Sequence, residues 1–226
     1  MLNIPSLETL IITNNHLQSL VEGCFHENLE YLNLEFNSLS QITEGVLKPL
    51  KNLKELNLSH NRFKGIELSY GLPSLESLDL SHNEIVVIVE DSFKNFWELK
   101  SLKLDHNYLT AISYKIFPTG NSITTLHLHY NAFMYIPETT AQILPKLREI
   151  TIGGNPWACP CLVIVTGYLQ EKNITQPECD RKYFSIGRSA VCVITDDESC
   201  TYEEKLTQVD FNNFRSSLQQ DLCFEL

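Results

Sequence analysis

A seven-fold repeat constrains the fold of this 226-residue chain more than any other feature of its sequence. The segment that begins at Leu7 fits the pattern L-x-x-L-x-L-x-x-N-x-L. The later copies read LEYLNLEFNSL from Leu29, LKELNLSHNRF from Leu53, LESLDLSHNEI from Leu75, LKSLKLDHNYL from Leu99, ITTLHLHYNAF from Ile123 and LREITIGGNPW from Leu147. Recurrence at this regular spacing predicts a solenoid, in which each copy forms one coil that stacks on the next.

The first half of each copy predicts a short strand. Apolar and polar residues alternate from Leu53 to Ser59, so Leu53, Leu56 and Leu58 are expected to point into the coil. Strands of successive coils should then pair in parallel and build one continuous sheet.

An asparagine lies in each copy where the chain turns sharply after its strand. Such a turn buries backbone N–H and C=O groups, and a buried polar group without a partner costs about 1–3 kcal/mol. A side-chain amide can both donate and accept hydrogen bonds there. We therefore expect a stacked structural ladder of Asn15, Asn37, Asn61, Asn83, Asn107, Asn131 and Asn155.

Cysteines are concentrated at the C-terminal end. Only Cys24 lies among the repeats, at a place that aligns with Val46 and Ser92 of later copies, and we interpret it as a small core residue. A cysteine-dense end predicts a disulfide-stapled cap made in an oxidising compartment. Its cysteines are Cys159, Cys161, Cys179, Cys192, Cys200 and Cys223.

The string NPWACPC directly after the last copy resembles the start of the cysteine-rich C-terminal cap of extracellular leucine-rich repeat proteins. This resemblance covers nearly all of residues 1–200. It implies an α/β leucine-rich-repeat solenoid, a curved horseshoe with a parallel β-sheet on its concave face and a loosely helical back. It also implies that Trp157 covers the last coil. Residues 181–200 are similar to the cap of secreted arthropod proteins of this class, including mosquito leucine-rich immune proteins.

The same resemblance implies a disulfide pairing. It gives the bonds Cys159–Cys179 and Cys161–Cys200. Cys192 is an additional cysteine that departs from the family pattern, so the pairing stays open. Cys223 is expected either to pair with Cys192 or to link a second chain.

The last segment of the chain predicts a helix. Its apolar residues recur at spacings of three and four, which indicates an amphipathic helix packed on the cap or the start of a coiled coil. The chain is accordingly divided into repeats over 1–155, a cysteine-rich cap over 156–201 and a C-terminal helix over 202–226.

Strand positions that point away from the core predict a mixed polar surface with a few aromatic rings. Such a concave surface suits a protein ligand better than a lipid, which needs an apolar pocket. The expected binding residues are Tyr31, Asn33, Glu35, Phe36, Glu55, Asp79, Lys103, Asp105, His127, His129 and Tyr130.

Histidines recur at one repeat position, because His60, His82 and His106 each precede the repeat asparagine. They should form a row, since neighbouring strands lie about 4.8 Å apart. A pH-sensitive or metal-binding stripe is one interpretation. We favour the other, a structural repeat position, and predict neither a metal site nor a cofactor.

Other sequence features bear on the class of function. The chain carries no G-x-S-x-G, phosphate-loop or H-E-x-x-H motif, which predicts a non-catalytic protein. Its formal net charge of −11 opposes binding to nucleic acid and to anionic lipid. No apolar stretch of about 18 residues is present, so we predict no membrane insertion. Two N-glycosylation sequons begin at Asn57 and Asn173, of which Asn173 is the better candidate.

The N-terminal end lacks both a leader and a cysteine-rich cap before Leu7, which we interpret as the start of a processed or truncated product. We expect either upstream sequence or a homo- or heterodimer through this open end or through the C-terminal helix. The sequence as a whole predicts a secreted protein-binding recognition module of innate immunity. The alternative is an extracellular adhesion, matrix or neural-surface protein.

Overall fold

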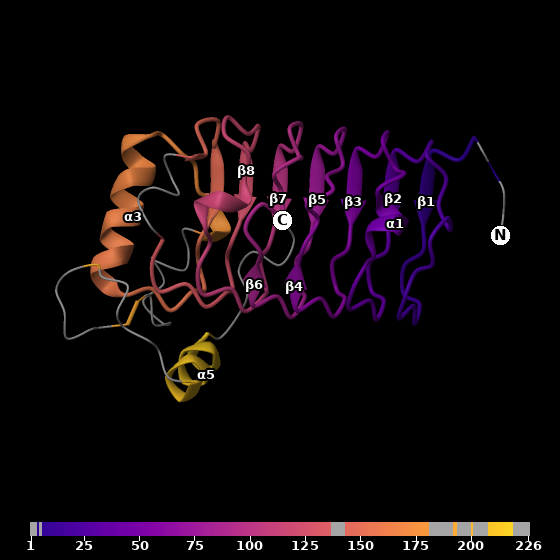
Figure 1. The fold of residues 1–226 in the computed structure, drawn as a ribbon. Helices are drawn as coiled ribbons and strands as arrows, with labels where there is room; N and C mark the ends of the chain where they lie inside the picture. Colours follow the sequence, from indigo (N-terminus) through magenta and orange to yellow (C-terminus); the bar gives the residue numbers. More distant parts are fainter. Residues whose placement is uncertain are drawn as a thin grey trace.

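The chain folds into a stack of coils, each of which contributes one short strand to a common sheet (Figure 1). The computed structural model describes residues 4, 6–136, 143–180, 192–193, 200 and 208–218. All seven strands are parallel and pair in chain order, which confirms the predicted solenoid. They are β1 (Thr9–Ile11), β2 (Tyr31–Asn33), β3 (Glu55–Asn57), β5 (Ser77–Asp79), β7 (Ser101–Lys103), β8 (Thr125–His127) and β9 (Glu149–Thr151).

The repeat leucines fill the interior of the stack. Leu53, Leu56 and Leu58 are all at most 2% exposed, and the equivalent residues of the next three coils are equally buried. Burial of a leucine side chain contributes about 1.5–3 kcal/mol, so each coil stabilises itself mainly through its neighbours. Alternation along the strand therefore leaves the intervening polar residues on the outer face of the sheet.

Six of the seven repeat asparagines connect neighbouring coils. Asn61 is typical: its Nδ2 donates to the carbonyls of Leu34, Leu58 and Ser59, and its Oδ1 accepts from Leu39 N at 2.9 Å. Asn15 differs, because it is exposed and its Nδ2 donates only to Thr13 O at 2.8 Å. The described residues provide no coil in front of it to bridge.

Among the described residues, the opposite side of each coil contains little regular structure. The described residues there include a helical turn, α1 (Glu44–Leu47), and a 3-10 turn, η1 (Tyr114–Ile116). Two coils instead pair as short parallel strands, β4 (Gly65–Ile66) and β6 (Val87–Ile88). In this described part, the expected helical back is only partly present, because β-branched residues such as Val87 and Ile88 favour extended backbone.

The last coil is closed by the segment that follows it. Helix α3 (Cys159–Glu171) stands at this end of the stack (Figure 1). The Asp180 carboxylate is fully buried and accepts hydrogen bonds from Ile152 N and Gly153 N at 3.0 and 2.6 Å. Burial raises the pKa of Asp180. Asp180 thus satisfies strand-end N–H groups that another coil would otherwise have paired.

The disulfides correct part of the expected pairing. Cys161 bonds to Cys200 as the family resemblance implied, but Cys159 bonds to Cys192 and not to Cys179. Parallel backbone pairing of Ala158 with Val193 brings Cys159 and Cys192 together, with a Cα–Cα distance of 5.0 Å. Cys179 is also disulfide-bonded. The expected bond between Cys192 and Cys223 is wrong, and Cys223 lies outside the described residues.

Two further features complete the architecture. Cys24 is a free thiol packed against the core, and burial raises its pKa. Helix α5 (Gln208–Ser217) lies apart from α3, at the foot of the coils in Figure 1. No helix in the described part of the chain has both the length and the apolar character needed to cross a membrane.

Candidate functional site

The outer face of the seven-stranded sheet, called here the sheet face, carries polar side chains in register from coil to coil. One row runs through Tyr31, Glu55, Ser77, Ser101, Thr125 and Glu149. Of these, Glu55 is exposed and the others are half-buried. In the neighbouring row, Lys103 lies 3.9 Å from Asp79 on the adjacent strand. The sheet face is therefore an accessible, mixed-charge surface built on rigid strands.

Four residues expected on this exposed face are instead buried: Asn33, Asp105, His127 and His129. Asn33 folds onto its own turn, where its Oδ1 accepts from Glu35 N at 2.9 Å. The other three make contacts between adjacent coils: His129 Nε2 lies 3.7 Å from Asp105 Oδ2, and His127 Nε2 lies 3.7 Å from Glu149 Oε1. Glu35 and Tyr130 remain half-buried, and Phe36 is exposed.

A continuous stack of rings runs along the edge where the strands end. This aromatic row consists of Phe36, His60, His82, His106 and Tyr130, with successive ring centroids 3.9, 4.1, 3.9 and 4.7 Å apart. The predicted histidine row is thus confirmed and extended at both ends.

The aromatic row depends on an unusual backbone conformation. All five residues have a positive φ of 51–54°. Gly154 has φ 64° at the next equivalent position, where a Cβ would come within 2.9 Å of the Tyr130 ring. Only glycine combines that backbone with this close approach, so the second residue of the Gly153-Gly154 pair ends the row.

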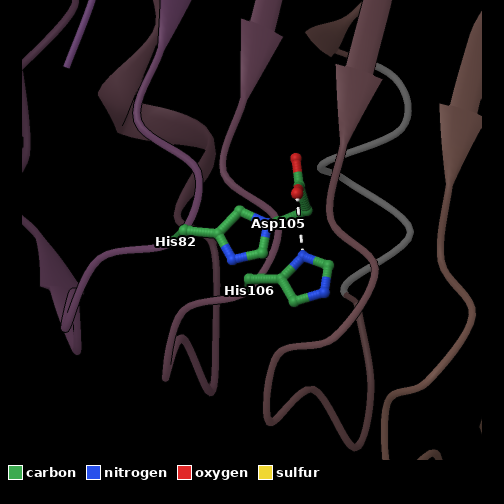
Figure 2. Close-up of side chains that lie close together, drawn as sticks. All are labelled: His82, Asp105 and His106. Atoms are coloured by element: carbon green, nitrogen blue, oxygen red, sulfur yellow. Dashed lines mark hydrogen bonds and ion pairs between the residues drawn. The ribbon is translucent and has the colours of Figure 1, made fainter. Parts of the chain in front are cut away.

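Asp105 lies behind the aromatic row and connects it to the buried histidines. His106 Nδ1 is 2.9 Å from Asp105 Oδ2, and Figure 2 shows His82 beside this pair. Burial, the largest influence, raises the pKa of Asp105, but the hydrogen bond to His106 and the nearby histidines outweigh it, so this pKa lies below its ordinary value. Burial also lowers the pKa of His127.

Acidification is expected to destabilise the aromatic row through His60. Burial is the largest influence and lowers the pKa of His60. The charges of Glu35, Asp79 and Asp105 act in the opposite direction, and His106 lowers the pKa further. A lowered pKa means that the folded protein favours the neutral ring. The contribution of His60 is therefore fully present above the unfolded value of about 6.5 and declines as the pH falls through the lowered folded value.

A His60→Asn variant isolates this effect, because asparagine tolerates a positive φ but does not titrate. Thermal unfolding followed by circular dichroism at pH 7.5 and at pH 5 should show a smaller loss of Tm in the variant than in the unmodified chain. His16→Asn, at an exposed histidine of the first coil, is the control. Equal losses in all three proteins would contradict the prediction.

Arg215 of α5 is a contact residue that sequence reasoning missed. Its guanidinium donates to the backbone carbonyls of Asn107 and Tyr130, both at 2.9 Å, and lies over the Tyr108 ring. Burial lowers its pKa. These contacts attach α5 to the repeats, where the sequence predicted packing on the cap. An arginine that reaches carbonyls 85 and 108 residues earlier leaves no local pattern to detect.

Comparison with known proteins identifies the repeats. A family model described as leucine rich repeat matches residues 5–63 and 97–156, and a second, for two copies of the repeat, matches 51–87. Human oligodendrocyte-myelin glycoprotein is 31% identical over 156 residues, which cover 68% of this chain and 30% of that protein.

Two solved structures share the fold. The leucine-rich repeat domain of APL1B, a mosquito protein, has a TM-score of 0.58 at 25% identity, and the matched region covers 68% of this chain and 43% of the APL1B chain. The TLR13–ssRNA13 complex has a TM-score of 0.56 at 31% identity, and the matched region covers 65% of this chain and 21% of the chain in that complex. The chain thus spans less than half the length of each of these relatives. Leucine-rich repeat domains generally mediate protein binding, and no enzymatic family is indicated. With its repeats matched over more than half of its length, the chain belongs to the leucine-rich repeat family.

Proposed function

We propose that this chain is a secreted, non-catalytic recognition module of innate immunity that binds a protein ligand on the sheet face. The observation that carries the proposal is the unbroken row of polar side chains, in register across six strands, from Tyr31 to Glu149. Strands held by a parallel ladder present these groups with little loss of conformational entropy on binding, which favours affinity.

The composition of the sheet face supports a protein ligand. Exposed Glu55, the partly exposed pair Lys103 and Asp79, and the rings of Tyr31 and Phe36 combine charge with aromatic surface. Protein interfaces are enriched in aromatic side chains, and complementary charges supply specificity. A formal net charge of −11 disfavours nucleic acid as the ligand.

The disulfides and the extracellular relatives support a secreted protein. Similarity to APL1B and TLR13 favours an immune role, whereas similarity to oligodendrocyte-myelin glycoprotein favours the alternative, adhesion at a neural surface. Exposed Asn173, at the turn after α3, is the proposed glycosylation site. Mass spectrometry of the chain made in secretory cells should find it modified.

Matched charge reversals test the binding surface. Affinity capture from native extracellular fluid should recover a partner with the unmodified chain, and Glu55→Lys should weaken its Kd by about tenfold or more, equivalent to 1.4 kcal/mol. Glu44→Lys, on α1 at the opposite side of the coil, makes the same charge change and should bind normally.

The outcome distinguishes the functions. A soluble defence protein or a microbial surface as partner supports the immune role, and a cell-surface protein supports the adhesion alternative. Equal loss of binding in both variants, with both folded by circular dichroism, would place the ligand away from the sheet face.

A further inference from the structure

Three buried side chains from two neighbouring coils converge between β7 and β8. Asp105 follows β7, His127 ends β8 and His129 lies two residues later. Backbone hydrogen bonds hold the two segments together, from Leu104 N to His127 O at 3.0 Å and from His106 N to His129 O at 3.1 Å. The three side chains are 6%, 4% and 0% exposed. We call them the buried triad.

The buried triad contains polar atoms that lack hydrogen bonds. Asp105 Oδ1 and both ring nitrogens of His127 are buried without a hydrogen-bond partner. Glu149 does not supply the missing hydrogen bond, because its Oε1 lies 3.7 Å from His127 Nε2, beyond hydrogen-bonding distance. Buried polar groups in folded proteins are nearly always paired, so these atoms point to a missing interaction partner.

The spacing of the buried triad fits that of ligands around one cation. One ligand atom from each residue can be chosen so that all three lie within 4.8 Å of one another. His129 Nε2 lies 3.7 Å from Asp105 Oδ2, which is too long for a hydrogen bond. Zinc bonds of about 2.0–2.1 Å in a tetrahedral arrangement place ligand atoms roughly 3.3 Å apart, so small side-chain movements close the site.

Outer contacts orient two of the three ligands. His129 Nδ1 lies 2.7 Å from Thr151 Oγ1, and Asp105 Oδ2 lies 2.9 Å from His106 Nδ1. When His129 Nδ1 donates to the threonine oxygen, its Nε2 carries the lone pair that faces Asp105. Metal-ligating histidines are held by such hydrogen bonds through their second nitrogen.

We propose that Asp105, His127 and His129 bind a zinc ion that links the coils of β7 and β8. Two imidazoles and one carboxylate are a ligand set that zinc accepts, whereas calcium and magnesium prefer oxygen ligands alone. A second possible set, His82, Asp105 and His106, shares the same carboxylate. The buried triad is favoured because neither ring nitrogen of His127 has a hydrogen-bond partner.

Zinc titration of chelator-treated protein tests the proposal. Isothermal calorimetry should show one zinc per chain, and zinc should raise Tm. His127→Gln should weaken zinc binding by more than the roughly 10- to 100-fold expected from loss of an outer contact. His16→Gln, at an exposed histidine, should leave it unchanged. No binding by the unmodified chain, or unchanged binding by a folded His127→Gln variant, would overturn the proposal.

X-ray absorption at the zinc edge of the unmodified chain provides a test that does not require any variant to fold. Two imidazole nitrogens with oxygen completing the shell would support the buried triad. A shell with sulfur would instead indicate the free thiol of Cys24, and one with a single imidazole would indicate a surface site. Either of these would overturn the assignment.

Discussion

Asn83→Ala is expected to lower the free energy of unfolding by about 3–5 kcal/mol, because several buried groups would lose their partner and each costs about 1–3 kcal/mol. Asn83 is 5% exposed, and its Nδ2 donates to the carbonyls of Leu58, Leu80 and Ser81. Its Oδ1 accepts from Phe63 N at 3.1 Å. Alanine would remove all four hydrogen bonds and leave three buried carbonyls and one buried N–H without the partner that Asn83 provides.

Asn15→Ala is the matched control for this prediction. The same substitution at the same repeat position removes one hydrogen bond from an exposed side chain and should change stability by no more than about 0.5 kcal/mol. Chemical denaturation gives both values, and the Tm of Asn83→Ala should fall by on the order of 10 °C. Similar small losses in the two variants would show that the amide ladder does not hold the coils together.

The strands and the asparagine ladder could be predicted because each is specified within one repeat. Leu53, Leu56 and Leu58 alternate with polar residues, and Asn61 follows at a constant offset, so the local sequence determines strand, turn and side-chain direction together. The exception is Asn15, because the described residues provide no preceding coil for its amide to bridge.

Disulfide pairing and burial at the sheet face could not be predicted in the same way. The bond between Cys159 and Cys192 depends on backbone pairing of segments 33 residues apart, which cysteine spacing does not encode. His127 and His129 are buried and contact Glu149, Thr151 and Asp105 of the adjacent coils. Strand alternation correctly placed both histidines off the core, but it says nothing about whether their neighbours cover them.

Closure of the last coil by Trp157 leads to the second large prediction. Trp157 is fully buried and stacks on Phe133 with ring centroids 6.1 Å apart. Its Nε1 donates to Ile152 O at 2.8 Å, a carbonyl that also accepts from Asn155 Nδ2. Trp157→Ala should therefore lower the free energy of unfolding by about 3–5 kcal/mol, mostly through the cavity left under the cap.

Two further variants separate packing from hydrogen bonding at this position. Trp157→Phe keeps an aromatic ring, and Ile152 O retains its bond from Asn155, so the loss should be clearly smaller than with alanine. Trp97→Ala removes the other tryptophan, which is 52% exposed, and should cost less than about 1 kcal/mol. Denaturation followed by circular dichroism measures all three variants. If Trp157→Ala were no more harmful than Trp97→Ala, the cap would not depend on this side chain, and other contacts, such as the hydrogen bonds that Asp180 accepts from Ile152 N and Gly153 N, would have to hold it against the last coil.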